Sequence, residues 1–97
     1  MTFEKMTVYD PMIILCSNCT VETQNTNLLL KDNEEVFYTI PYSKITLCKI
    51  LPLLLPTLVL RFSDKESNTI LTIRDNRSIK KTKELYYDIL EYKKHYT

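Results

Sequence analysis

The sequence predicts a mainly β domain of antiparallel strands followed by one C-terminal α-helix. Short apolar runs recur along residues 12–74, clusters of Asn, Asp, Ser and Pro separate them, and the hydrophobic period changes to three and four residues from Ser78 onward. The chain has 97 residues, of which 44% are hydrophobic, so it has the size of one domain and enough apolar residues for a core. We therefore predict a single domain over residues 1–97, with 1–11 as a candidate N-terminal extension.

The apolar runs predict about six or seven strands. They span residues 12–16, 20–24, 27–31, 35–40, 44–50, 57–62 and 69–74. Short strands with turn residues between them are typical of an antiparallel sheet or a partly open barrel. In the last two runs, apolar residues at every second position alternate with polar ones such as Arg61 and Arg74. This alternation predicts one core face and one solvent face.

Residues 78–96 form the helical pattern, with apolar residues at three-four spacing along one stripe. Ser78 or Asn76 can accept the free N–H groups of the first turn. Lys80 and Lys81 lie in that first turn, where positive charge is unfavourable for the helix dipole, so they either are solvated or have another role. We expect the apolar stripe to cover an open end or face of the sheet.

The composition excludes several functions. The chain contains no glycine, which rules out a P-loop and a dinucleotide fingerprint and leaves turns with positive φ to Asn and Asp. A net charge of +1 gives no chain-wide field for nucleic acids or acidic membranes, even though seven tyrosines could serve as stacking platforms. We therefore expect neither direct nucleic-acid binding nor a membrane partner.

Catalytic and metal-binding patterns are weak. Cys16 and Cys19 form a CxxC pair, but a closed zinc site needs four ligands and only Cys48 and His95 remain as further ligands. A redox CxxC should open a helix, and this one lies between strand-like runs. His95 is close to the C-terminus, where chains fray. We predict no enzyme activity, no cofactor and no metal, in an intracellular protein with reduced thiols and no signal peptide.

The most unusual segment is residues 49–56, where two prolines interrupt an apolar loop. A loop this apolar either packs down as a buried crossover connection or binds another molecule. The sequence leaves both interpretations open for its central residues, 53–55.

The order of elements resembles the pleckstrin-homology (PH) superfold, and four segments resemble one family within it. They read Tyr-Ser-Lys-Ile at 42–45, Cys-Lys-Ile-Leu-Pro at 48–52, Leu-Val-Leu at 58–60 and Asp-Ile-Leu at 88–90. Together they are similar to the N-terminal PH domain of the large non-enzymatic core subunit of the transcription and repair factor TFIIH. The resemblance implies a PH-like, partly open antiparallel barrel or sandwich capped by the helix.

The resemblance also implies a nuclear protein-interaction module of a transcription initiation and nucleotide excision repair complex. Such a module docks acidic disordered segments of transcription or repair factors and contacts other subunits of its complex. The lysine and apolar residues that hold the ligand in the family match Lys49, Ile50 and Pro52. Strand alternation adds Arg61, on the outer side of the next strand, as a second cation.

Two alternative functions remain. A phosphoinositide-binding PH-like domain normally needs a basic cluster around the first strand-turn-strand, and residues 18–27 contain neither lysine nor arginine. A small structural assembly subunit would use the loop at 53–55 as its interface.

Overall fold

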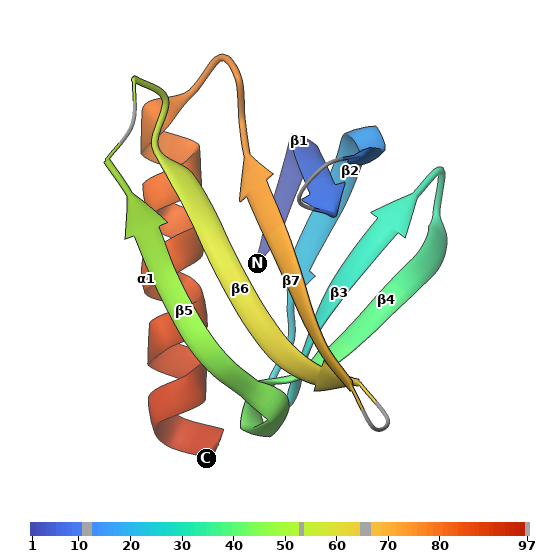
Figure 1. The fold of residues 1–97 in the computed structure, drawn as a ribbon, viewed down its shortest axis with the longest axis vertical. Helices are drawn as coiled ribbons and strands as arrows, with labels where there is room; N and C mark the ends of the chain where they lie inside the picture. The colour runs from blue at the N-terminus through green and yellow to red at the C-terminus, as the bar shows by residue number, and fades with distance from the viewer. Residues whose placement is uncertain (11–12, 53, 65–66, 97) are drawn as a thin grey trace.

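A computed structural model describes residues 1–10, 13–52, 54–64 and 67–96. The elements are β1 (Thr2–Asp10), β2 (Ile13–Thr23), β3 (Asn27–Asp32), β4 (Glu35–Pro41), the 3-10 turn η1 (Tyr42–Lys44), β5 (Ile45–Leu51), β6 (Thr57–Asp64), β7 (Ser67–Arg74) and α1 (Ile79–Tyr96). The strands form one antiparallel sheet in the order β4-β3-β2-β1-β7-β6-β5, which does not close (Figure 1). The predicted mainly β class with one C-terminal helix is confirmed, and the arrangement fits a PH-like sandwich.

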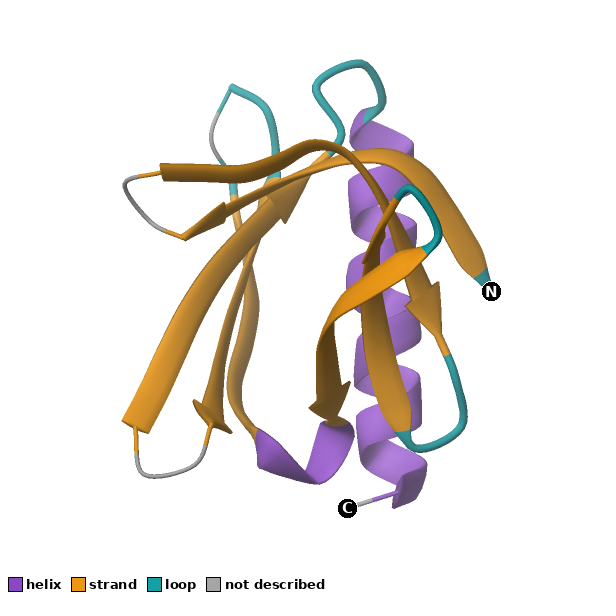
Figure 2. Cartoon of the chain, turned by 90° about the vertical axis from the view of Figure 1, so that its right-hand side faces the viewer, coloured by secondary structure: helices purple, strands orange, loops and turns teal. Residues whose placement is uncertain are grey.

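The sheet curls so that its two halves and α1 surround one space (Figure 2), and the buried side chains from these elements form one hydrophobic cluster there. Tyr38 on β4 contacts Phe62 on β6, with ring centroids 5.7 Å apart, although the two strands lie far apart in the sheet order. The helix packs mainly against η1, β5 and β6, and its Leu85 and Ile89 are fully buried. Each such side chain contributes about 1.5–3 kcal/mol through its removal from water.

The predicted facing of β6 and β7 is confirmed. Leu58, Leu60 and Phe62 on β6 are buried, as are Leu71 and Ile73 on β7. The residues between them are directed to the other side of the sheet, where Arg61 is exposed and Arg74 is half-buried. Period-two alternation was therefore sufficient to assign both faces of these strands.

The N-terminal segment requires a correction. Residues 2–10, which the sequence suggested as part of an extension, form β1 between β2 and β7 in the middle of the sheet. Its core residues Phe3, Met6 and Val8 do not follow a period of two, because the pairing with β2 shifts register at these positions. Lys5 has a φ of 59° within this irregular stretch. A bulged strand lacks the alternation from which strands are recognised.

The N-terminus of α1 is capped as expected, because the Ser78 Oγ accepts a hydrogen bond of 3.2 Å from the Lys81 N–H. Asp75 adds a second layer: its Oδ1 accepts the N–H groups of Arg77 and Ser78 at 2.7 and 3.1 Å. The Lys81 Nζ lies 2.6 Å from the Asp75 Oδ2. Burial favours the neutral carboxyl of Asp75, but Lys81 and the two N–H donors outweigh it and hold the pKa below its ordinary value. Lys81 therefore has a partner, despite its unfavourable place in the first turn.

The cysteines differ from the expectation of three reduced thiols. Cys16 and Cys19 are both buried on β2 and are joined by a disulfide, whereas Cys48 is a free thiol. Burial raises the pKa of Cys48 to about 11, against a smaller opposing effect of Lys93. The CxxC pair lies within a continuous strand, so it lacks the helix N-terminus that activates redox cysteines.

Candidate protein-interaction face

The face of β5, β6 and β7 that is directed away from the core brings two predicted cations together. Lys49 pairs with Val59 across β5 and β6, while Arg61 pairs with Leu47 on one side and Ile70 on the other. Val59 in turn pairs with Thr72. We define the β5–β7 face by these outward residues: Leu47, Lys49, Val59, Arg61, Ile70 and Thr72.

Lys49 and Arg61 occupy diagonal positions on the β5–β7 face, and both are exposed. Within the described chain, Lys49 makes no hydrogen bond or ion pair. The Arg61 Nε donates a hydrogen bond of 3.1 Å to the Thr46 Oγ1, and that hydroxyl donates to the Arg61 carbonyl at 3.2 Å. The bond through Nε fixes the direction of the Arg61 side chain while its terminal nitrogens remain able to pair with a carboxylate.

The apolar part of the β5–β7 face lies beside these cations. Ile70 is 41% exposed, Leu47 is half-buried, and Val59 is covered by its neighbours. No residue that defines the face is acidic. Positive charge beside an apolar ledge is complementary to a segment that combines carboxylates with an aromatic or leucine side chain.

A third cation, which the sequence did not indicate as a site residue, borders the β5–β7 face. The Arg74 Nη2 donates a hydrogen bond of 3.0 Å to the Tyr9 hydroxyl, and the guanidinium carbon lies 5.1 Å from the centroid of the Tyr9 ring. Tyr9 pairs with Thr72, so it extends the same row of residues onto β1. Alternation had placed Arg74 on the solvent side, but its partner lies on the strand that was not predicted.

The other two predicted site residues lie elsewhere. Ile50 follows Lys49 in β5, so it points to the opposite side of the strand, where it is half-buried. Pro52 is exposed directly after the end of β5. The structure thus brings Lys49 and Arg61 together on one face and places Ile50 on the other.

The apolar loop that follows is described in part. Leu53 lies outside the described residues, Leu54 is 98% exposed and Leu55 is half-buried. Leu54 therefore does not belong to a buried crossover.

No protein-family model matches the sequence, and a search of curated proteins finds no match. The resemblance to the TFIIH domain, and the function and nuclear location that it implies, stay predictions. No described helix is long and apolar enough to cross a membrane.

Proposed function

We propose that this protein is a protein-interaction module whose β5–β7 face docks acidic, disordered segments of partner proteins. The observation that carries the proposal is the diagonal pair of exposed cations, Lys49 and Arg61, around Val59 and beside the exposed Ile70. Following the sequence resemblance, we propose transcription or repair factors as the source of these segments and a nuclear complex as the setting.

The chemistry of docking follows from the two kinds of side chain. Carboxylates of the segment pair with the Lys49 ammonium and the Arg61 guanidinium, while an aromatic or leucine side chain covers Ile70 and Leu47. The charge pairs lie at an exposed surface, so salt screens them. Ordering a disordered segment also costs conformational entropy. We therefore expect weak binding that falls steeply as the ionic strength rises.

A titration of the whole chain with a fluorescein-labelled acidic peptide tests this proposal. The peptide carries glutamate and aspartate around one phenylalanine. Lys49→Glu and Arg61→Glu should each weaken binding about tenfold or more, because each replaces an attraction by a repulsion. Lys83→Glu is the matched control, since Lys83 is an exposed lysine on α1 and makes no ion pair with a described residue. Its affinity for the peptide should equal that of the wild type.

A soluble inositol phosphate, titrated in parallel, separates the alternatives. Binding of this anion with no binding of the peptide would support the phosphoinositide alternative and contradict the proposal. Absence of binding by either probe would leave the assembly-subunit alternative, with the exposed Leu54 as the first residue to change.

A further inference from the structure

A second surface of opposite charge lies at the other half of the sheet, between β2 and the β3–β4 hairpin. Among the described strands, β2 pairs with β3 over residues 20–23, whereas its N-terminal half, residues 13–19, pairs with β1 alone. The strands separate beyond the pairing of Thr20 with Lys31. A cavity of about 700 Å³ occupies the space between them. We call it the notch; its lining residues are Leu15, Asp32, Asn33, Glu35, Val36, Phe37 and Tyr38.

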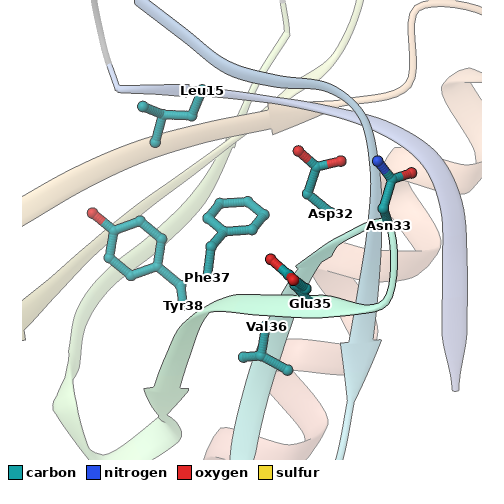
Figure 3. Close-up of a pocket in the computed structure, with 7 residues that line it drawn as sticks. All are labelled: Leu15, Asp32, Asn33, Glu35, Val36, Phe37 and Tyr38. Atoms are coloured by element: carbon teal, nitrogen blue, oxygen red, sulfur yellow. The ribbon is translucent and has the colours of Figure 1, made fainter.

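The walls of the notch expose apolar side chains from both strands. Leu15 on β2 lies across from the Phe37 and Tyr38 rings of β4, and all three side chains border the open space (Figure 3). Phe37 is the extra residue of a bulge, because Lys31 pairs with Val36 while Leu30 pairs with Tyr38. Ile13 and Ile14, at the start of β2, are exposed as well. An apolar patch of this kind on a surface marks an interaction site.

The rim of the notch is acidic. Asp32 and Glu35 line it, and Glu34 lies in the hairpin turn between them; none of the three carboxylates makes an ion pair with another described side chain. Lys31, the nearest lysine in the sequence, already pairs with Glu22 at 2.8 Å. The hairpin turn sets the backbone positions of these residues, since Asn33 and Glu34 both have positive φ, as a two-residue turn of type I′ requires. The charge that complements this rim is positive.

The wall that β2 forms also presents an open strand edge. Among the described strands, the N-terminal half of β2 has no neighbour on the side of the hairpin. An extended segment can add to such an edge through main-chain hydrogen bonds, while its alternate side chains enter pockets. The notch therefore favours an extended occupant over a helical one.

We propose that the notch binds an extended segment of a partner protein in which lysine or arginine residues flank one aromatic or branched aliphatic side chain. The apolar side chain enters between Leu15 and Phe37, and the flanking cations pair with Asp32 and Glu35. This site is separate from the β5–β7 face and has the opposite charge preference. The module would thereby hold a basic partner and an acidic partner at once.

Fluorescence anisotropy of the whole chain with a labelled peptide tests the notch. The probe is an amidated nonapeptide of alternating lysine and threonine with one central phenylalanine. Glu35→Lys and Phe37→Ser should each weaken its binding about tenfold or more, through lost charge pairing and a lost apolar contact respectively. The matched controls are Glu4→Lys, an exposed carboxylate outside the notch, and Ile70→Ser on the β5–β7 face. Both controls should bind the probe as the wild type does.

Several results would overturn the notch proposal. They are absence of binding, equal binding by Glu35→Lys, and equal binding of an analogue with glutamate in place of lysine. Concentration-dependent self-association of the wild type, measured by sedimentation and removed by Phe37→Ser, would identify a second copy of the chain as the occupant instead. Glu35 is an exposed surface residue, so its variant decides the matter even if Phe37→Ser fails to fold.

Discussion

The two halves of the sheet differ in how far α1 covers them. The helix α1 packs on the inner face of β5 and β6 through Leu85 and Ile89, so the inward apolar side chains of these strands are largely buried in the core. The β3–β4 hairpin lies on the opposite side of the molecule from α1 in Figure 1, and Leu15 and Phe37 remain open to solvent there. The helix thus buries the inner face of β5 and β6, whereas the end of the hairpin leaves apolar side chains that are available to a ligand.

The largest effect expected from this difference is at the covered half. Leu85→Ala should lower the free energy of unfolding by about 3 kcal/mol, because it removes a fully buried side chain and leaves a cavity between α1 and the sheet. Urea denaturation followed by circular dichroism measures the change. A loss below about 1 kcal/mol would mean that α1 contributes little to the core and would break the comparison.

An intermediate effect is expected at the junction of β7 and α1. Asp75→Asn should lower the free energy of unfolding at pH 7 by about 2 kcal/mol, since it removes a charged acceptor of two N–H groups and leaves the Lys81 ammonium with the Glu4 carbonyl but without a carboxylate partner. The pKa of Asp75 is lowered in the folded state, so its contribution is present above the unfolded pKa and is lost as the pH falls through the folded value. The gap between variant and wild type should narrow below about pH 4. A gap that is equal at pH 7 and pH 3 would contradict this assignment.

The smallest effect is expected at the open half. Phe37→Ser should change the free energy of unfolding by less than about 1 kcal/mol, because the ring is 36% exposed and contacts the core mainly through Tyr38. The same urea experiment measures it. A loss as large as that of Leu85→Ala would show that the ring is a structural residue and would remove its availability to a ligand.

Patterns within a single strand were predictable from the sequence, whereas relations between strands were not. Alternation placed Arg61 on the solvent side of β6, and the change of period located α1 with its Ser78 cap. The same alternation shows that Lys49 and Ile50 cannot share a face, although the resemblance grouped them. β1 was not predicted, because its bulges disrupt the period-two alternation of apolar and polar residues.

The notch could not be predicted for a different reason. The composition of the run 12–16 predicts a buried strand, but Ile14 and Leu15 are exposed, because they lie on the N-terminal side of Thr20, where β2 does not pair with β3. The point at which two strands part depends on their register and on the twist of the whole sheet, which a sequence pattern does not record. Similarly, the pairing of Arg74 with Tyr9 joins residues 65 positions apart.

The central place of β1 has a consequence for how the chain folds. Its two neighbours are β2, which follows at once, and β7, which comes last among the strands. During synthesis β1 and β2 can form a hairpin early, but the pairing of β1 with β7 must wait until residues 67–74 have been made. Such non-local pairing slows folding, because the entropy of closing a long loop is lost before the contact is gained. The β1–β7 pairing is therefore expected to form late and to limit the folding rate of this domain.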